Sequence, residues 1–435
     1  MSGLRVMVVG SGAREHALSW KLAGDAAVGD VIAAPGNAMM TDVAHVRSDV
    51  RLTDLDALVA TALEENVDLV VVGPEAPLVG GVADRLVDAD VAVFGPTAAA
   101  ARLEGSKAFA RDVCRSAGVE MAAGAAFDSL PDALAYIDSI EAPVVVKADG
   151  LAAGKGVALC ETLADAEDAL RAALIDGRFG DSGRRVVVEE WLHGVEASVI
   201  AICDGTRSVL LPAARDHKRL GDGDTGPNTG GMGAYSPIPE LDDAALTQLQ
   251  LTVFEPILGE MARRGTPYRG ALFAGLMLTA NGPRVLEFNA RFGDPETQAI
   301  LPRLEQPLAP LLWTAATRSL AGHAPLAAGS AMKTVGVTLA SSGYPDAPSV
   351  GDPIEGILDA RSSGALVFAA GVREPAFASG TRGVVETAGG RVLTVVGRGA
   401  DIRDAADEAY AAADVIRFAG KKMRHDIGRE LAAVA

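Results

Sequence analysis

Short, largely apolar runs alternate with helical patterns over the first 105 residues, and this alternation restricts the fold more than any other feature. Strands that lack a polar face are buried on both sides, which is typical of parallel sheets covered by helices. The runs are Leu4–Gly10, Val28–Ala34, Val67–Gly73 and Val91–Gly95. Residues 53–66 predict a helix, and its expected buried face consists of Leu55, Leu58, Val59, Ala62 and Leu63. The N-terminal region is therefore predicted to be a doubly wound parallel α/β sheet.

The pattern changes three times along the chain, which predicts four regions: 1–105, 106–192, 193–328 and 329–435. In the second region, Ser106–Ala117 predicts a helix with its first residue as the N-cap, and Pro143–Ala148 predicts a buried strand. In the third, Ala271–Thr279 and Arg284–Phe288 flank Asn281-Gly282, which is a hairpin signal. We therefore expect an antiparallel sheet in the third region.

The last region predicts a small α+β domain. Its final helix is expected at Ile402–Phe418, and Gly389-Gly390 predicts a hairpin turn between the two strands that flank it. The strands are predicted at Lys333–Ala340, Ala365–Val372, Gly383–Thr387 and Arg391–Val396.

Composition narrows the class of protein. The 435 residues carry a formal net charge of -18, so a nucleic-acid partner is not expected. Cys114, Cys160 and Cys203 are far apart, which argues against disulfides and a cysteine-built zinc site. No basic-then-apolar leader and no apolar stretch of about 20 residues is present. We therefore expect a soluble cytoplasmic protein without a membrane partner.

The first predicted strand ends in Gly10-Ser11-Gly12-Ala13-Arg14-Glu15-His16. This is similar to the dinucleotide fingerprint GxGxxG, but Glu15 stands where the third glycine belongs. The second strand leads into Pro35-Gly36-Asn37, without an acidic residue to hold a ribose hydroxyl, so a nicotinamide dehydrogenase is disfavoured. Arg14 and His16 favour a phosphate or sugar site, and a tight turn without a ligand is the alternative.

The loop Gly73–Leu78 follows a strand at the sheet edge where open α/β sheets place ligands. Pro74 and Glu75 lie in it, and Glu75 suits a ribose or an amine. A rigid turn bounded by proline is an equally good interpretation.

A Gly/Ala-rich loop follows the strand that ends near Lys147. Its exposed N–H groups are suited to closing over a triphosphate, and its lysines to neutralising one. It is not a Walker A loop, because the glycine spacing is one residue short and Gly156 replaces Ser or Thr. The residues expected to contact the phosphates are Lys147, Gly150, Gly154, Lys155 and Gly156.

Acidic side chains at two further strand ends suit a nucleotide and a metal ion. Glu189 and Glu196 suit the amino and hydroxyl groups of an adenosine, although a charged surface is the better interpretation of these two alone. Glu287 and Asn289 alternate with Phe288, so they share one face of a strand and are suited to Mg²⁺. Arg291 beyond them is placed to hold a transferring phosphoryl group.

The polar cluster at Arg215–Arg219 lies close to the glycine loop Thr229–Gly233. A charge run is usually a solvated surface. Because this one adjoins a glycine loop, a functional role is favoured.

Together these blocks resemble the phosphoribosylamine–glycine ligases, a family of the ATP-grasp superfamily. The match runs essentially from end to end and includes Gly10–His16, Pro35-Gly36-Asn37, Gly73–Leu78, Leu103–Lys107, Lys147–Gly156, Asp216–Arg219, Gly226–Pro237, Glu287–Glu296 and Asp426-Ile427-Gly428. The resemblance implies a Rossmann-like substrate domain at 1–105, a two-lobed ATP-grasp module divided at 192/193, and a small C-terminal domain from 329. It also implies ATP-dependent ligation of glycine to phosphoribosylamine through glycyl phosphate, in purine biosynthesis.

By the same resemblance, Lys107 and Lys147 contact the ATP phosphates, and Glu287 and Asn289 hold Mg²⁺ or Mn²⁺. Arg291 stabilises the phosphoryl group. The adenosine is expected against Glu189, Leu192 and Glu196, and the reaction at Lys147, Asp216, Lys218 and Arg291. Phosphoribosylamine is expected at Gly10, Gly12, Arg14, Glu15, His16, Asn37, Pro74 and Glu75, and glycine near Asp216, Lys218, Gly230 and Gly231.

Two other readings stay open at this point. The nearer is another ATP-grasp enzyme, a carboxylase or a ligase with a different acceptor, and glycine dependence of ADP release separates the two. The other is a nucleotide-binding protein without turnover, which the metal and phosphoryl-transfer groups disfavour. A monomer is expected.

Overall fold

The computed structural model describes residues 3–140, 142–152, 155–322, 331–375 and 384–429. A parallel sheet of five strands forms the N-terminal part, in the order β3-β2-β1-β4-β5. These strands are β1 (Leu4–Gly10), β2 (Val28–Pro35), β3 (His45–Val46), β4 (Leu69–Val72) and β5 (Ala92–Phe94). Every residue of β4 is buried, as expected for a strand covered on both faces. The predicted doubly wound parallel sheet is confirmed.

Helices flank this sheet, and one detail of their predicted packing is wrong. They are α1 (Ala13–Ala23), α2 (Leu55–Glu64), α3 (Glu75–Val79), α4 (Val82–Asp88) and α5 (Ala98–Gly105). In α2 the buried side chains are Leu58, Thr61 and Ala62, whereas Leu63 is 53% exposed. The Thr61 hydroxyl donates to the carbonyl of Ala57 at 2.8 Å, so a polar residue takes the buried position that the apolar pattern assigned to Leu63.

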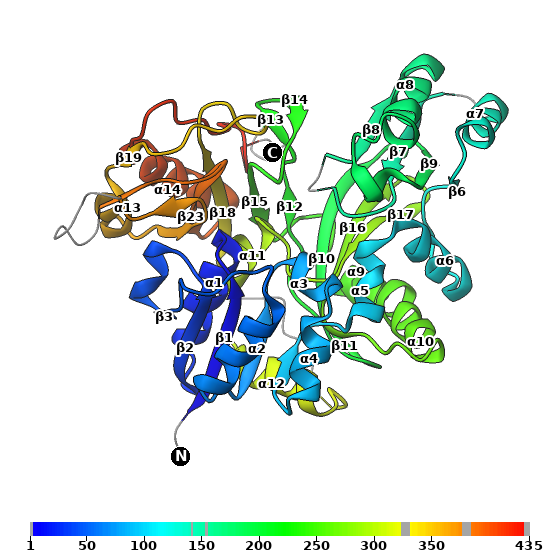
Figure 1. Cartoon of the computed structure of the whole chain (residues 1–435). Helices are drawn as coiled ribbons and strands as arrows, with labels where there is room; N and C mark the ends of the chain where they lie inside the picture. The colour runs from blue at the N-terminus through cyan, green and yellow to red at the C-terminus, as the bar shows by residue number, and fades with distance from the viewer. Residues whose placement is uncertain (1–2, 141, 153–154, 323–330, 376–383, 430–435) are drawn as a thin grey trace.

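A second sheet, ordered β6-β9-β7-β8, follows helix α6 (Lys107–Ala117). Its strands are β6 (Gly124–Phe127), β7 (Val144–Ala148), β8 (Val157–Cys160) and β9 (Val186–Glu190). Helices α7 (Leu130–Ser139) and α8 (Leu163–Leu174) bury their apolar side chains against β7 and β9 (Figure 1, upper right).

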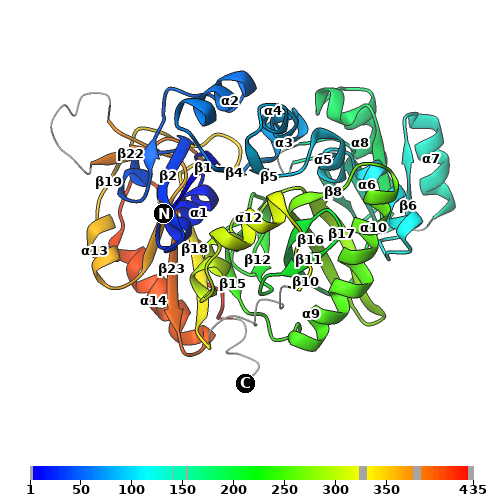
Figure 2. The same ribbon diagram turned by 90° about the horizontal axis from the view of Figure 1, so that it is seen from below.

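The third sheet is antiparallel and has the order β11-β10-β16-β17. Its strands are β10 (Val195–Asp204), β11 (Ser208–Leu210), β16 (Arg269–Thr279) and β17 (Gly282–Asn289). Thr279 pairs with Gly282, so the predicted hairpin is confirmed, with its turn at Ala280 and Asn281 and with Gly282 as the first residue of β17. Helix α12 (Ala309–Thr317) packs against β5 and also against β10 and β16, which joins this sheet to the N-terminal one (Figure 2).

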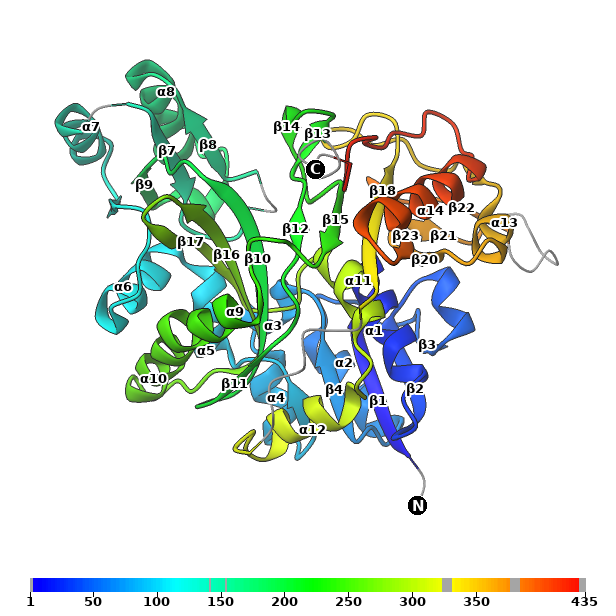
Figure 3. The same cartoon turned by 180° about the vertical axis from the view of Figure 1, so that it is seen from behind.

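The C-terminal sheet, ordered β12-β15-β18-β23-β20, combines strands from distant parts of the chain. They are β12 (Arg215–Asp216), β15 (Gly233–Ser236), β18 (Lys333–Ala340), β20 (Leu366–Ala369) and β23 (Arg391–Gly399). Helix α14 (Ile402–Val415) packs against β18 and β23. Figure 3 shows β12 and β15 on the side of this sheet that faces the third sheet. Two strands from the middle of the sequence therefore belong to the sheet that the end of the chain completes.

The hairpin predicted at Gly389-Gly390 is wrong. Strand β22 (Val385–Thr387) pairs with β19 (Pro353–Ile354) and β21 (Val372–Arg373), whereas β23 pairs with β18 and β20. The single strand predicted at Ala365–Val372 is likewise divided between β20 and β21, in two sheets. A Cβ on Gly371 would lie 2.7 Å from Cα of Gly389. The glycines here allow two backbones to approach closely where the chain passes between sheets.

Helices α9 (Asp243–Leu249) and α10 (Glu255–Arg263) lie near the third sheet, whereas α11 (Glu296–Ile300) packs against β15 and β18 of the C-terminal sheet. A small hairpin of β13 (Arg219–Gly221) and β14 (Thr225–Asn228) stands beside the C-terminal sheet, and α13 (Ile357–Ser362) packs against α14. Within the described ranges no helix is long and apolar enough to cross a membrane.

Candidate active site

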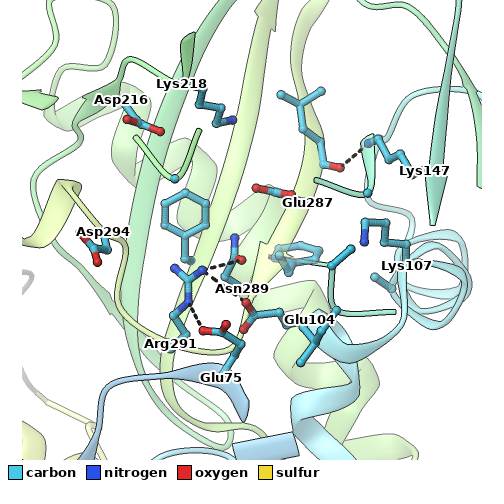
Figure 4. A pocket seen from close by; sticks show the side chains of 18 of the residues that line it. Glu75, Glu104, Lys107, Lys147, Asp216, Lys218, Glu287, Asn289, Arg291 and Asp294 are labelled. Atoms are coloured by element: carbon cyan, nitrogen blue, oxygen red, sulfur yellow. Dashed lines mark hydrogen bonds and ion pairs between the residues drawn. The ribbon is translucent and has the colours of Figure 1, made fainter. Parts of the chain in front are cut away.

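A cavity of about 460 Å³ lies where the N-terminal, second, third and C-terminal sheets meet. Figure 4 shows its charged side chains converging from several elements. The structure gathers these predicted site residues around it: Arg14, Pro74, Glu75, Lys107, Lys147, Gly150, Gly156, Glu189, Asp216, Lys218, Gly230, Glu287, Asn289 and Arg291. Residues predicted from separate motifs therefore share one cavity.

Lys147 is held at the end of β7 by two oxygen atoms. Its ammonium lies 2.6 Å from Oε2 of Glu189 on the neighbouring strand β9, and it donates to the carbonyl of Leu286 at 3.1 Å. The other carboxylate oxygen of Glu189 lies 2.9 Å from Nη1 of Arg111. Both Glu189 and Lys147 are buried, so this contact fixes the direction in which the ammonium points.

Lys107 is the first residue of α6, directly after the N-cap Ser106. Its ammonium donates to the carbonyl of Gly150, at the start of the Gly/Ala-rich loop, at 3.3 Å. Burial lowers the pKa of Lys107 from its ordinary value. Because burial disfavours an uncompensated charge, an anion in the cavity would be bound favourably here.

The Glu287 carboxylate lies among several cations at the centre of the cavity (Figure 4). Burial acts to raise the pKa of Glu287, but Lys218, Lys147 and Lys107 together hold it below the ordinary value. The side chain is therefore ionised and makes no hydrogen bond with the part of the chain that the structure describes. A carboxylate in this state is available to a cation that enters with a ligand.

Arg291 links the end of β17 to the N-terminal part of the chain. Its guanidinium donates to Oδ1 of Asn289 at 3.2 Å and lies 3.3 Å from Glu75 and 3.4 Å from Glu104 (Figure 4). Glu104 also accepts a hydrogen bond of 2.7 Å from the N–H of Ala290. Burial is the main reason that the pKa of Glu104 rises to about 7. Sequence reasoning did not single out Glu104, although it stands in the block next to Lys107.

Two carboxylates line the cavity close to each other: Asp216 is half-buried and Glu296 is buried. Burial and the neighbouring Glu296 raise the pKa of Asp216 well above its ordinary value. Oδ1 of Asp216 is buried and has no hydrogen-bond partner among the described residues, and Glu296 accepts from the Ser198 hydroxyl at 2.8 Å. Lys218 pairs with Glu196 at 2.7 Å. A cationic ligand group between Asp216 and Glu296 would relieve the repulsion of two like charges.

Arg391 is the cavity residue that sequence reasoning missed most completely. From the first position of β23, its guanidinium donates to the carboxylate and to the carbonyl of Asp294, both at 3.0 Å, and to the carbonyl of Gly230. It thereby fastens the loop after β17 to the glycine loop. No local motif marks Arg391, because its partners lie about a hundred residues or more away in sequence.

The fingerprint-like turn Gly10–His16 has its anion position filled by the chain itself. Oε2 of Glu15 accepts from the N–H of Gly12 at 2.7 Å, at the N-terminus of α1. A Cβ on Gly10 or Gly73 would overlap the Glu15 side chain, so these glycines make room for the carboxylate. Arg14 pairs with Glu15 and donates to the carbonyl of Phe292 at 3.2 Å. The glycines here accommodate a carboxylate where a dinucleotide-binding loop would hold a phosphate.

His16 and Asn37 contact the C-terminal sheet. Nδ1 of His16 accepts from the N–H of Ala369, and Nδ2 of Asn37 donates to the carbonyl of Ala369, both at 2.9 Å. Burial, with a smaller contribution from Arg361, lowers the pKa of His16 to about 3. His16 therefore has a structural role, because its ring is a buried acceptor between two sheets.

The other predicted site residues lie outside the lining of this cavity. They are Gly10, Gly12, Glu15, His16, Asn37, Lys155, Leu192, Glu196 and Gly231. Lys155 is exposed. Gly154 falls outside the described residues.

No group of three or more His, Cys, Asp or Glu side chains within the described ranges is placed to hold a metal ion. Glu287 and Asn289 nevertheless present a carboxylate and an amide on one strand, facing the cavity. Mg²⁺ commonly takes one or two protein oxygens and completes its shell with water and substrate phosphates. The donor set therefore fits a hard divalent cation that is bound together with a nucleotide.

Comparison with known proteins covers the chain from end to end. Three family models match: the N domain of phosphoribosylglycinamide synthetase over residues 4–104, its ATP-grasp (A) domain over 105–297 and its C domain over 334–430. A phosphoribosylamine–glycine ligase of Caulobacter vibrioides is 46% identical over 428 residues, which are 98% of each chain.

Two solved structures are also similar. The crystal structure of phosphoribosylamine–glycine ligase from Thermotoga maritima has a TM-score of 0.80 and 34% identity, and the match covers 97% of this chain and 100% of that one. The biotin carboxylase domain of the Hydrogenobacter thermophilus 2-oxoglutarate carboxylase, in complex with MgADP, has a TM-score of 0.69 at 16% identity. That match covers 97% of this chain and 92% of that one, and it bears on the fold alone.

Proposed function

The chain belongs to the phosphoribosylglycinamide synthetase family, and from this premise we propose how its residues carry out the family's reaction. The protein is an ATP-dependent ligase that joins glycine to 5-phosphoribosylamine in purine biosynthesis, giving glycinamide ribonucleotide, ADP and phosphate. One observation carries the assignment of residues: Lys107, Lys147, Glu287 and Arg291 reach a single cavity from different elements.

ATP occupies the part of the cavity between the second and third sheets. Lys107 and Lys147 neutralise its phosphates beside Gly150, where the Gly/Ala-rich loop begins. The adenosine lies against Glu189, Leu192 and Glu196. In support, the pKa of Lys107 is lowered by burial, and a phosphate oxygen beside it would favour the charged ammonium.

Glu287 and Asn289 hold Mg²⁺ or Mn²⁺, which neutralises charge on the phosphates when it is bound. The pKa of Glu287 supports this assignment, because the surrounding lysines hold it below the ordinary value although burial acts to raise it. Arg291, beside Asn289, donates to the oxygens of the phosphoryl group during its transfer.

Glycine lies near Asp216, Lys218 and the glycine loop. Its ammonium is placed between the carboxylates of Asp216 and Glu296, and its own carboxylate points toward Arg291. An oxygen of that carboxylate attacks the γ-phosphorus of ATP, and ADP leaves, which yields glycyl phosphate. Such a transfer depends on positioning and charge neutralisation rather than on a protein nucleophile.

Phosphoribosylamine enters from the N-terminal side, at Arg14, Pro74 and Glu75. Its amine nitrogen attacks the acyl carbon of glycyl phosphate, the C–O bond to phosphate breaks, and the amine loses one proton. The lining supports this direction of entry, because these three residues form its N-terminal wall. We further propose a cytoplasmic monomer.

The test is ADP release from ATP and Mg²⁺, with glycine and freshly prepared phosphoribosylamine each omitted in turn. Release should require both, and glycinamide ribonucleotide should appear in step with ADP. If ADP were released equally well without glycine, the substrate would be a different acid, and the proposed glycine site would be refuted.

A further inference from the structure

Asp149 joins the base of the Gly/Ala-rich loop to the helix that carries Lys107. Its carboxylate accepts from the Ala108 N–H at 2.7 Å and from the Ser106 hydroxyl at 2.9 Å. Its carbonyl accepts from the N–H of Lys107 at 3.1 Å. The two residues that flank Lys107 and Lys107 itself are therefore all bonded to one residue at the end of β7.

The side chain of Lys107 makes a second contact with the base of the loop. The Lys107 ammonium donates to the carbonyl of Gly150, the residue that follows Asp149. Ser182 then fixes the next step of the loop, because its carbonyl accepts from the N–H of Gly150 at 3.1 Å and its hydroxyl donates to the carbonyl of Leu151 at 2.8 Å. The start of the loop and the start of α6 thus form one hydrogen-bonded unit.

The Asp149 carboxylate caps the start of α6 and also determines where Lys107 lies. A carboxylate at a helix N-terminus satisfies free N–H groups and complements the helix dipole. At Asp149 the helix so capped begins with a cation that faces the cavity, and the capping residue lies two positions after Lys147, the second cation of the proposed phosphate site. A shift of the cap would move Lys107 relative to Lys147.

We propose that Asp149 is a positioning residue for ATP, which sets Lys107 against the base of the phosphate loop. The proposal rests on the assignment of Lys107 to the ATP phosphates. The carboxylate acts through Lys107 and through the helix start, and does not touch the nucleotide. Nucleotide affinity is therefore the property that depends on it, whereas the binding of glycine does not.

A second capped helix offers a matched control. Asp165 in the first turn of α8 accepts from the Thr162 hydroxyl at 2.7 Å and from the Thr162 N–H at 3.0 Å. It is exposed, and α8 carries no residue of the cavity lining. Asp165→Ala removes a comparable helix-start hydrogen bond without touching the site.

The experiment measures the Kd of β,γ-imido-ATP with Mg²⁺ by calorimetry, and the KM of glycine by turnover. Asp149→Ala should weaken the nucleotide analogue about tenfold and leave the KM of glycine within twofold. Asp149→Asn, whose amide oxygen still accepts from Ala108, should restore most of the affinity. Asp165→Ala should lower the melting temperature as Asp149→Ala does, with an unchanged Kd.

Lys107→Met separates this proposal from the site assignment on which it rests. If the effect of Asp149 passes through Lys107, Asp149→Ala added to Lys107→Met should weaken binding less than twofold further. A full tenfold further loss, or an unchanged Kd in Asp149→Ala alone, would overturn the proposal. An unchanged Kd in Lys107→Met would instead refute the phosphate site, and the proposal with it. If Asp149→Ala does not fold, Ser106→Ala replaces it in the same cycle.

Discussion

Nδ1 of His16 accepts a hydrogen bond of 2.9 Å from the main-chain N–H of Ala369, a residue 353 positions further along the chain. Nδ2 of Asn37 donates a hydrogen bond to the carbonyl of the same residue. Ala369 ends β20, the outermost strand of the C-terminal sheet, where main-chain groups face outward without a neighbouring strand. One side chain from α1 and one from the turn after β2 therefore satisfy an open sheet edge, which is otherwise prone to pair with another chain.

The His16 contact predicts a pH dependence of stability. An unfolded histidine takes up a proton below about pH 6.5, whereas folded His16 does so only near its lowered pKa of about 3. The stabilisation is therefore complete above pH 6.5 and is lost as the pH falls toward 3. Between pH 7.5 and 5.0 the loss amounts to roughly 2 kcal/mol in the free energy of unfolding.

Urea unfolding of the wild type and His16→Asn at the two pH values measures this. The variant keeps a neutral side chain, so the stability difference between the two proteins should shrink by about 2 kcal/mol at pH 5.0. His45→Asn, at an exposed histidine, is the control for the general effect of acid. An equal difference at both pH values would contradict the prediction.

Glu287→Gln should abolish most turnover while the fold persists. The amide keeps the shape of the side chain but loses the charge that a divalent cation needs, so kcat should fall about a hundredfold or more. The unfolding midpoint should stay close to that of the wild type. Glu161→Gln, at an exposed position, is the control and should leave kcat unchanged. Near-normal turnover in Glu287→Gln would remove Glu287 from the metal site.

Gly73→Ala should destabilise the protein through Glu15. The added Cβ overlaps the Glu15 carboxylate, and overpacking of this kind typically costs about 1–3 kcal/mol. Gly259→Ala in α10 meets open space and should stabilise by about 0.5–1 kcal/mol. Thermal unfolding of the two variants should show a lowered melting temperature for Gly73→Ala and a raised one for Gly259→Ala. Adding Glu15→Ala to Gly73→Ala should cost less than the sum of the single changes, and strict additivity would show that Glu15 is not the obstacle.

Arg391→Gln should impair catalysis from the far end of the chain. The change removes the cation that joins Asp294 to the carbonyl of Gly230. The loop after β17 and the glycine loop, which adjoin the proposed glycine site, then lose their alignment. We expect kcat/KM for glycine to fall about tenfold to a hundredfold, or roughly 1.4–2.8 kcal/mol. Arg184→Gln breaks an exposed pair and should leave kcat/KM unchanged. An equal response of both variants would contradict the role of Arg391.

Local patterns predicted the elements that local forces determine. The apolar run at β4 and the hairpin signalled by Asn281-Gly282 were predicted because burial and turn chemistry act over a few residues. The motif around Glu287 predicted the centre of the cavity for the same reason, since alternation along one strand fixes which side chains share a face.

Pairing between distant segments could not be predicted in this way. The Gly389-Gly390 pair resembles a hairpin turn, yet its flanking strands belong to two sheets because Gly389 lies against Gly371. Arg391 reaches the site because it is the first residue of β23, and the position of β23 depends on its pairing with β18 and β20 in the C-terminal sheet. His16 illustrates the converse: its motif suggested a ligand, and its partner is a strand more than three hundred residues away.

The pairing of β15 with β18 has a consequence for synthesis of the protein. The hydroxyl of Thr334 in β18 donates to the carbonyl of Ser236 in β15, 98 positions earlier. The glycine loop directly precedes β15, so its position depends on a strand that leaves the ribosome much later. A nascent chain can complete the N-terminal sheet early, but the glycine loop at the proposed glycine site cannot take its final position until β18 has emerged.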